Sequence, residues 1–256
     1  MNIKKNVKDI LRPTYYKLMQ PKIDKMCKQT ESRLQAYHNL YSGRRCFIIG
    51  NGPSLRIPDL ESLSNEITFA FNRVYVLFEN TKWRPTFYLC QDPTIYRSCH
   101  KEINTTVRCK EKFLKPTGEK KYNFPNAIFY NVDYRYSKKR IQPMFSNDVS
   151  NCIYDGRTVT YSAIQLAAYM GFNEIFLLGV DCYYSANNNH INENSYPDKK
   201  MYDSKKVGMP PDIAYNFVAF EAAKAYCINA GIKICNATRG GKLEVFERID
   251  FDDIDV

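Results

Sequence analysis

The segment CFIIGNGPSLRIPDL, residues 46–60, runs from an apolar stretch into a turn with two glycines and then into a helix-like pattern. Gly50 and Gly52 allow the backbone to turn tightly after a strand and to approach a ligand closely. Asn51 and Ser54 offer side-chain hydrogen bonds beside the free N–H groups where the next helix begins. The segment therefore predicts a strand, a turn and a helix that together bind the sugar or phosphate of a nucleotide.

This turn lacks the marks of two common nucleotide sites. The third glycine of the dinucleotide fingerprint is absent, because position 55 is leucine, and no Walker lysine follows. The sequence therefore disfavours NAD as a ligand. A turn with two glycines would by itself serve any connection from a strand to a helix.

Beyond residue 44, short apolar runs alternate with helical stretches. Nearly continuous apolar runs are typical of strands in a parallel sheet covered on both faces, and they lie at 45–50, 67–71, 86–91, 127–131, 174–180 and 232–236. Helical patterns lie at 72–78, 161–170 and 213–230. The alternation predicts an α/β protein with a Rossmann-like, doubly wound, mostly parallel sheet, in which ligands collect at the carboxyl ends of the strands.

Positive charge is concentrated at the N-terminus. Residues 1–45 hold eleven Lys or Arg and three acidic residues, whereas the whole chain has a formal net charge of +10. Apolar positions three or four apart predict an amphipathic helix within 14–40, interrupted near Pro21. We expect residues 1–43 to form a basic helical arm. Its charged side is either simply solvated or attracted to an anionic membrane surface or a polyanionic acceptor.

The composition also indicates in which cellular compartment the protein works. No apolar run is long enough to span a membrane, and the first five residues lack the apolar core of a signal peptide. Nine cysteines, an odd number without a CxxC pair, indicate structural thiols rather than disulfides or zinc ligands. We expect a cytoplasmic protein without a metal site, peripheral on the inner membrane face if the arm binds lipid.

Residues 184–211 have no apolar periodicity. A loop of this length inside a compact domain is usually a lid or disordered. Because it follows directly on a predicted strand that ends near Asp181, we interpret it as a lid over a site in a catalytic domain of residues 44–256.

Polar side chains follow several of the predicted strands, whose carboxyl ends should meet at one edge of the sheet. Asn72, which is equally suited to cap a helix, follows the second strand, and Gln91 and Asp92 follow the third. Thr158 and Thr160 stand before a small-residue helix, where either simple capping or a bond to a phosphate or ribose is expected.

The strand that ends near Gly179 is followed by a carboxylate and two phenols, those of Asp181, Tyr183 and Tyr184. Phenols can donate hydrogen bonds to a leaving phosphate without a metal. Thr238 follows the last strand and is expected to close the same crevice from the far side.

The ordered set of motifs resembles two families. IIGNGPSL, FN after the second strand, the Thr/Ser-bearing turn and NEIFLLGVDCYY are similar to the bacterial sialyltransferases of the Campylobacter type, which transfer sialic acid from CMP-sialic acid using a Rossmann-like variant of the GT-A fold. WRPTFYLCQD, PPD and NATRGGKLEVF make the chain more similar still to the bacterial domain family named after 6-hydroxymethylpterin diphosphokinase. The resemblance spans about residues 44–248.

The resemblance implies roles for individual residues. Asn51, Ser54 and Asn72 would hold the cytidine nucleotide. Thr158 or Thr160 would approach its phosphate or sugar. Asp181 would lie near the ribose, and Tyr183 would face the leaving phosphate. The sialyltransferases carry a histidine base before the last long helix, where this chain has GMPPD, so His190 or Asp212 becomes the candidate base. The complete set of nucleotide-binding positions is Gly50, Asn51, Gly52, Ser54, Asn72, Gln91, Asp92, Thr158, Thr160, Gly179, Asp181 and Thr238.

Three functions remain open. The leading hypothesis is a metal-independent glycosyltransferase of polysaccharide biosynthesis, which needs no cofactor beyond its CMP-sugar donor and modifies a glycan or lipid-linked acceptor. The alternative is a diphosphokinase that acts on a pterin-like alcohol with ATP and Mg²⁺, for which Asp92 and Asp181 would supply carboxylates. A nonenzymatic nucleotide sensor or nucleic-acid binder is disfavoured, because no recognisable nucleic-acid module is present. A homo-oligomer is left open.

Overall fold

The computed structural model describes residues 3–183, 196–202 and 212–256, and gives only the backbone of residues 3–14 and 16. Its elements, in chain order, are α1 (Ile3–Gln35), β1 (Arg45–Ile49), α2 (Ile57–Ser62), η1 (Leu63–Asn65), β2 (Thr68–Phe71), η2 (Val74–Glu79), β3 (Phe87–Cys90), α3 (Pro93–Ser98), α4 (His100–Thr105), β4 (Glu111–Leu114), β5 (Ile128–Phe129), β6 (Val132–Asp133), α5 (Arg135–Lys139), β7 (Ile153–Tyr154), α6 (Val159–Tyr169), β8 (Glu174–Leu178), η4 (Lys199–Met201), α7 (Ile213–Ala230), β9 (Lys233–Asn236), β10 (Glu247–Arg248) and η5 (Phe251–Asp253).

Eight strands form one sheet in the order β10-β9-β8-β1-β2-β3-β4-β5, and every pairing in it is parallel. The chain winds outward from β1 in one direction through β2 to β5, and in the other through β8 to β10. The predicted doubly wound α/β sheet is therefore confirmed. Its strand order reverses between β1 and β8, where Ile48 of β1 pairs with Phe69 of β2 on one side and Leu177 of β8 on the other. Sheets of this kind bind ligands at such a switch point.

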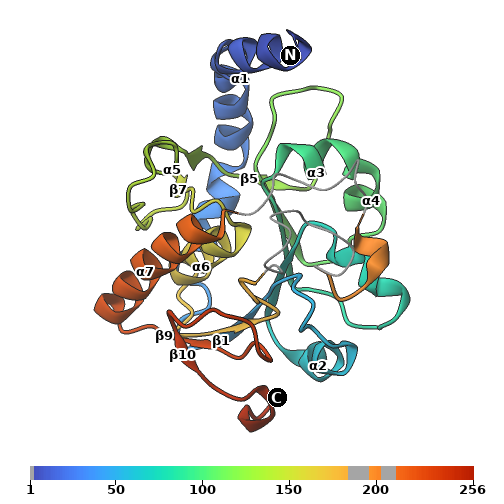
Figure 1. Cartoon of the computed structure of the whole chain (residues 1–256), viewed down its shortest axis with the longest axis vertical. Coiled ribbons are helices and arrows are strands. Elements are labelled where there is room, and N and C mark those ends of the chain that lie inside the picture. The colour runs from blue at the N-terminus through green and yellow to red at the C-terminus, as the bar shows by residue number, and fades with distance from the viewer. Residues whose placement is uncertain (1–2, 184–195, 203–211) are drawn as a thin grey trace.

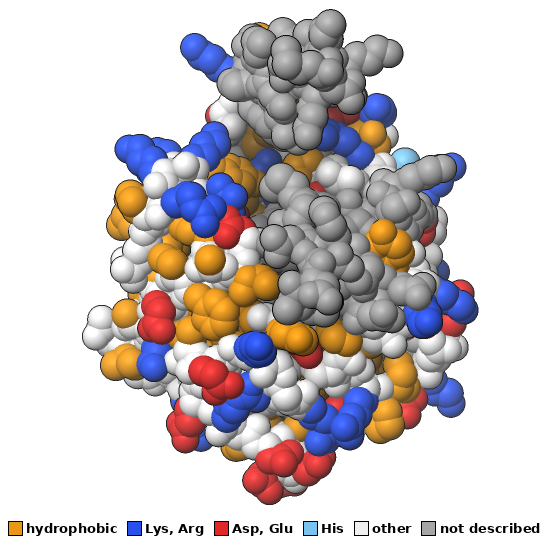
Figure 2. Space-filling view, in the orientation of Figure 1, with side chains coloured by type: hydrophobic (Ala, Val, Ile, Leu, Met, Phe, Trp, Pro, Cys, Tyr) orange, Lys and Arg blue, Asp and Glu red, His pale blue; other side chains and the backbone are white. Residues whose placement is uncertain are grey.

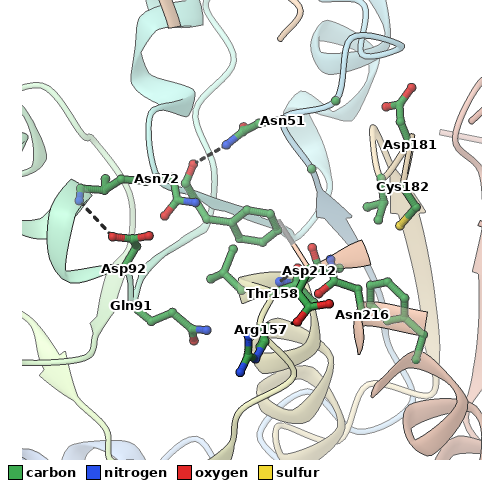
Figure 3. Close-up of a pocket in the computed structure, with 18 of the residues that line it drawn as sticks. Asn51, Asn72, Gln91, Asp92, Arg157, Thr158, Asp181, Cys182, Asp212 and Asn216 are labelled. Atoms are coloured by element: carbon green, nitrogen blue, oxygen red, sulfur yellow. Dashed lines mark hydrogen bonds and ion pairs between the residues drawn. The ribbon is translucent and has the colours of Figure 1, made fainter. Parts of the chain in front are cut away.

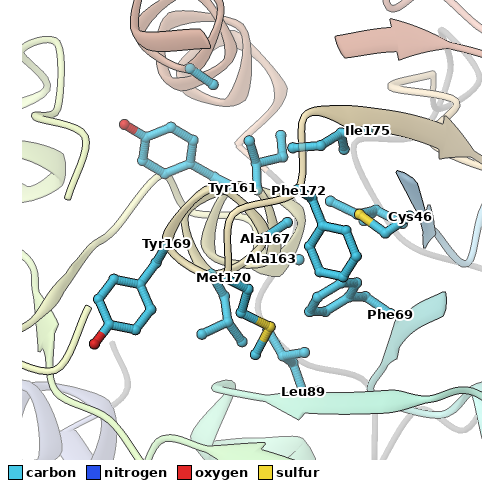
Figure 4. Packing of buried hydrophobic residues seen from close by; sticks show 14 of the residues in the cluster. Cys46, Phe69, Leu89, Tyr161, Ala163, Ala167, Tyr169, Met170, Phe172 and Ile175 are labelled. Atoms are coloured by element: carbon cyan, nitrogen blue, oxygen red, sulfur yellow. The ribbon is translucent and has the colours of Figure 1, made fainter. Parts of the chain in front are cut away.

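Helices cover both faces of the sheet, as nearly continuous apolar strands require (Figure 1). On one face α6 packs closely because Ala163 and Ala167 point toward Phe69 and Phe172 in the apolar layer (Figure 4). On the other face α2, α3 and η2 cover a second apolar layer that includes Trp83. The two layers explain why the strand interiors are wholly buried.

The N-terminal helix is longer and more closely docked than the charge pattern predicted. It is continuous through Pro13 and Pro21, so the expected break near Pro21 is wrong. Ile23 and Leu34 are buried, whereas Leu18 is 66% exposed. The second half of α1 packs along edge strand β5 (Figure 1). The second half of α1 therefore contributes Ile23 and Leu34 to the apolar core of the domain.

Several further elements differ from expectation. β4 was not predicted, because only two of its four residues, Phe113 and Leu114, are apolar. The helix expected at 72–78 is the short 3-10 helix η2, which begins two residues after Asn72. All nine cysteines are free thiols. In the part of the chain that the structure describes, no helix is both long and apolar enough to cross a bilayer.

Candidate nucleotide site

A cavity of about 590 Å³ opens at the carboxyl ends of β1, β2, β3 and β8 (Figure 3). Most of the predicted site residues line it: Gly50, Asn51, Gly52, Asn72, Gln91, Asp92, Thr158, Thr160, Gly179, Asp181, Tyr183 and Asp212. Ser54 and Thr238 do not line it but contact residues that do. Tyr184 and His190 lie outside the described residues, as does most of the expected lid at 184–211. Side chains far apart in the sequence thus meet at one rim.

The two glycines of the first turn are needed for contact with β8. Gly50 N–H donates to the Leu178 carbonyl at 2.7 Å, and Gly52 N–H to the Gly179 carbonyl at 2.8 Å. A Cβ at Gly50 would lie 2.2 Å from the Gly179 oxygen, and one at Gly52 would lie 1.8 Å from Asp181 Oδ2. Neither glycine has a positive φ. Their expected role in ligand approach is therefore accompanied by a stricter one, which is to let the ends of β1 and β8 touch.

Asp181 is fixed at the end of β8 by its neighbours. Its Oδ2 accepts a hydrogen bond from Ser54 Oγ at 2.8 Å, and its carbonyl accepts one from Lys242 N–H at 2.7 Å. Thr238 Oγ1 accepts from Val180 N–H at 3.0 Å. Burial raises the pKa of the Asp181 carboxyl. In this structure Ser54 and Thr238 therefore support the wall of the site, and their direct contact with a nucleotide stays a prediction.

Two asparagines present acceptor oxygens that are not used by the described residues. Asn51 Nδ2 donates to the Phe71 carbonyl at 3.1 Å, which fixes the amide and leaves its Oδ1 buried without a partner there (Figure 3). Asn72 has φ 55°, and its carbonyl accepts from Tyr88 Oη at 2.7 Å. Its Oδ1 is likewise buried and unmatched within the described chain, and its side chain caps no helix. Unsatisfied buried acceptors are costly, so they favour a ligand that donates hydrogen bonds.

The end of β3 contributes one amide side chain to the cavity and one helix cap. Gln91 lines the cavity, and its Oε1 accepts a hydrogen bond from Ser162 Oγ at 2.6 Å. Asp92 Oδ1 accepts from Thr94 N–H at 2.7 Å and thereby caps α3. Thr158 caps α6 in the same way, through Thr160 N–H at 3.3 Å. The simple capping interpretation therefore holds for Thr158, and the structure shows Asp92 to be a helix cap as well, whatever either adds to ligand binding.

The opposite wall contains an arginine that the sequence analysis did not select. Arg157 has φ 56°, and its guanidinium donates to Asp212 Oδ2 at 3.0 Å and to the Ser137 carbonyl at 3.1 Å. Asp212 also pairs with Arg140 at 2.6 Å and caps α7. The hydrogen bond from Arg140 holds the pKa of the Asp212 carboxyl below its usual value. A carboxyl so stabilised is a weaker proton acceptor, and its role as base stays a prediction.

Other cavity residues were also missed. They are Tyr134, Ser137, Lys138, Asp155, Cys182, Tyr196 and Asn216. Asp155 is buried, which raises the pKa of its carboxyl. Asn72, Arg157 and Cys182 share a positive φ although none is glycine. Such backbone conformations cluster at functional sites, where surrounding contacts offset the strain.

Residues 196–202 are the described part of the expected lid, and they are anchored. The buried Arg73 guanidinium donates to the Lys200 carbonyl at 3.0 Å and also to the Met201 carbonyl. The Met201 side chain is fully buried. Tyr196 lies at the start of this segment and lines the cavity. The described middle of the segment 184–211 is therefore anchored to the domain, and Tyr196 contributes to the cavity wall.

Arg239, which follows Thr238, pairs with acids rather than facing the cavity. It bonds to Asp59 at 2.9 Å and to Asp252 at 2.9 Å, which fastens the C-terminal turn η5 to α2. Among the described residues, no three His, Cys, Asp or Glu side chains are grouped so that they could hold a metal ion.

Solved structures resemble this fold. The MAf glycosyltransferase from Magnetospirillum magneticum AMB-1 aligns with a TM-score of 0.53 and 17% identity over 90% of this chain, which spans 39% of that protein. The sialyltransferase CstII from Campylobacter jejuni, solved with CMP-3FNeuAc, aligns with a TM-score of 0.45 and 17% identity over 80% of this chain and 86% of CstII. No curated protein matches the sequence.

The family of the chain follows from its sequence. A family model described as 6-hydroxymethylpterin diphosphokinase MptE-like matches residues 19–187, from the middle of α1 to just beyond β8. The match covers more than half of the chain and includes the β1 turn and the β8 end. The chain belongs to the 6-hydroxymethylpterin diphosphokinase MptE-like family.

Proposed function

We propose that the protein is a glycosyltransferase that takes a sugar from a CMP-linked donor. The observation that carries the proposal is the pair of unmatched buried acceptors, Asn51 Oδ1 and Asn72 Oδ1, at one end of the cavity. Ribose hydroxyls and the exocyclic amine of cytosine are donors that would satisfy them. The resemblance of the motifs to sialyltransferases supports cytidine as the base. The fold shared with the MAf glycosyltransferase is compatible with this activity.

The same cavity offers cationic and dipolar groups for a phosphate. The α6 N-terminus and the Arg157 guanidinium stand on one wall, and both favour negative charge. A guanidinium has five N–H donors, and Arg157 commits only part of them to Asp212 and Ser137. In the proposed reaction these groups, with the phenol of Tyr183 or Tyr184, stabilise the leaving CMP without requiring a metal.

Direct displacement requires a base for the acceptor hydroxyl. The acceptor oxygen would attack the anomeric carbon while the bond from that carbon to the phosphate oxygen breaks, and the proton passes to the base. His190 and Asp212 remain candidates. Asp155 joins them, because it lines the cavity and burial raises the pKa of its carboxyl. A raised pKa makes a carboxylate a better proton acceptor near neutral pH.

The proposal also specifies where in the cell the enzyme would act. A glycan or lipid-linked acceptor would meet the enzyme on the cytoplasmic face of the membrane, and the basic residues of 1–43 would add attraction to anionic lipid. The exposed lysines of α1, Lys17, Lys22 and Lys25, support this attraction.

The name of the family supports the alternative, a Mg²⁺-dependent transfer of pyrophosphate from ATP to a pterin-like alcohol. Asp92 and Asp181 both line the cavity and would be the carboxylates nearest the phosphates. In the described structure Asp92 caps α3 and Asp181 accepts from Ser54, so both carboxylates already accept hydrogen bonds.

A thermal-shift panel distinguishes the two functions. CMP, UDP, GDP and ATP would each be added with Mg²⁺ or with EDTA. The proposal predicts stabilisation by CMP that survives EDTA, and hydrolysis of a CMP-linked sugar by the CMP-responsive protein. Stabilisation by ATP alone, dependent on Mg²⁺, would overturn it in favour of the diphosphokinase.

A further inference from the structure

The segment that leaves α5 carries positive charge at the cavity mouth. Lys138, Lys139 and Arg140 are consecutive, and no acidic residue occurs between Asp133 and Asp148. Arg140 pairs with Asp212, but the two lysines are exposed and form no salt bridge with any residue that the structure describes. Lys138 lines the cavity, so the charge lies at its rim.

Two apolar side chains follow directly and are held outward. Ile141 and Met144 are each 50% exposed. The Ile141 carbonyl accepts a hydrogen bond from Tyr215 Oη at 2.7 Å, and the Met144 carbonyl accepts one from Tyr161 Oη at 2.8 Å. Both tyrosines are buried. Because the backbone is fastened inward at these two residues, the exposure of their side chains is a fixed feature of the fold.

The chain just before α5 contacts the basic helix α1. Asn131, a few residues before α5, donates from Nδ2 to Asp24 Oδ1 of α1 at 3.4 Å. Figure 2 shows basic and hydrophobic side chains side by side on the part of the molecule that carries α5. Exposed lysines that form no salt bridge with a described residue, beside fixed, exposed apolar side chains, match the chemistry of a bilayer interface, in which headgroups are anionic and the layer below is apolar.

We propose that the surface 138–144 docks on an anionic lipid bilayer and turns the cavity mouth toward it. A polyanionic glycan would bind the lysines without any use for Ile141 and Met144, which is why a bilayer is the favoured occupant. The proposal rests on the proposed function only in its purpose, which is to bring a lipid-linked acceptor to the cavity. Binding to vesicles needs neither donor nor turnover, so each idea can fail without the other.

Flotation of the full chain with vesicles tests the surface. Vesicles of phosphatidylcholine with phosphatidylglycerol would be compared with vesicles of phosphatidylcholine alone, at low and high salt. We expect binding to the anionic vesicles only, weakened by salt. Lys139→Gln should reduce the partition coefficient about fivefold, and Ile141→Ser with Met144→Ser should reduce it on the order of tenfold.

A matched control lies on α7, where Lys224 precedes the 67% exposed Ile228 by one helical turn. Lys224→Gln with Ile228→Ser should leave flotation unchanged. Thermal melts of all variants should coincide with that of the unaltered chain, because the changed side chains are exposed or, for Lys224, only partly buried. Absence of flotation at low salt would overturn the proposal. So would normal flotation of the Ile141→Ser, Met144→Ser chain together with its normal retention on an acidic polysaccharide, which would identify a polyanion instead.

Discussion

Gly52 and Asp181 are packed so closely that a Cβ atom added to Gly52 would lie 1.8 Å from Asp181 Oδ2. The same oxygen accepts the hydrogen bond from Ser54, so the turn after β1 and the end of β8 form one unit. Because Gly52 does not have a positive φ, the need for glycine is one of space rather than of backbone conformation. The first strand and the strand beside it thus define the cavity jointly.

Gly52→Ala should therefore displace Asp181 and weaken nucleotide binding. We expect the free energy of unfolding to fall by roughly 1–3 kcal/mol, as for other overpacked sites. We expect the affinity for CMP to fall by more than this loss of stability alone would cause. Thermal denaturation and titration with CMP measure the two effects. Gly43→Ala is the control. Gly43 has φ 76°, and no atom lies within 4 Å of an added Cβ. The substitution should therefore lower stability only through backbone strain and leave CMP binding intact. Unchanged CMP affinity in Gly52→Ala would contradict the proposed position of the site.

Asn51→Ala tests the unmatched acceptor directly. The change removes Oδ1 and also the hydrogen bond from Nδ2 to the Phe71 carbonyl. Loss of one ligand hydrogen bond should weaken CMP binding about tenfold, close to 1.4 kcal/mol. Isothermal titration would measure it. Asn104→Ala is a matched control, since Asn104 is exposed and its Nδ2 also donates to a backbone carbonyl, that of Asn123 at 2.9 Å. Equal affinities of the two variants would refute the assignment.

The buried Asp155 should make stability depend on pH. Burial raises the pKa of its carboxyl in the folded protein. The folded state therefore holds the proton more tightly than the unfolded state, and this contribution to stability is complete below the unfolded pKa and is lost as pH rises through the folded pKa. At neutral pH the charged carboxylate then opposes folding. Asp155→Asn should raise the melting temperature at pH 7 and raise it less at pH 4.

The same variant reports on function. If Asp155 is the base, Asp155→Asn should lose most transfer of sugar to acceptor while it gains stability, a trade-off common at active sites. Asp253→Asn, an exposed carboxylate near the C-terminus, is the control and should change neither quantity. A melting temperature for Asp155→Asn that falls at pH 7 would show that the carboxylate stabilises the fold.

The sheet was predictable because strands buried on both faces consist of consecutive apolar residues, which the sequence shows directly. β1 and β8 are covered on both faces, so residues 46–49 and 175–178 are uniformly apolar. β4 escaped detection because its first half, Glu111 and Lys112, is only half-buried near the edge of the sheet. Arg33 of α1 pairs with Glu111 at 3.0 Å, a contact between distant segments that no local pattern records.

One wall of the site was predictable and the other was not. Asn51, Asn72 and Gln91 follow strands that are neighbours in the sheet, and parallel strands bring such residues to one edge. Asp155 and Arg157 reach the cavity through β7 and the turn before α6, which are not part of the main sheet. The polar turn that holds them was noted only for its threonines, and the positive φ of Arg157 has no signature in residue type.

The structure changes what should happen when the N-terminal region is removed. Thr30 Oγ1 accepts a hydrogen bond from Phe129 N–H of β5 at 2.9 Å, and Ile23 and Leu34 are buried against the domain. Deletion of residues 1–43 should uncover the edge of the sheet and remove two buried apolar side chains, whose burial contributes about 1.5–3 kcal/mol each. We expect a lower melting temperature and aggregation, whereas deletion of residues 1–14 should leave the melting temperature near that of the full chain. Light scattering and thermal melts of both shortened proteins measure this difference. If the chain of residues 44–256 melts like the full one, α1 is an accessory arm, as the charge pattern first indicated.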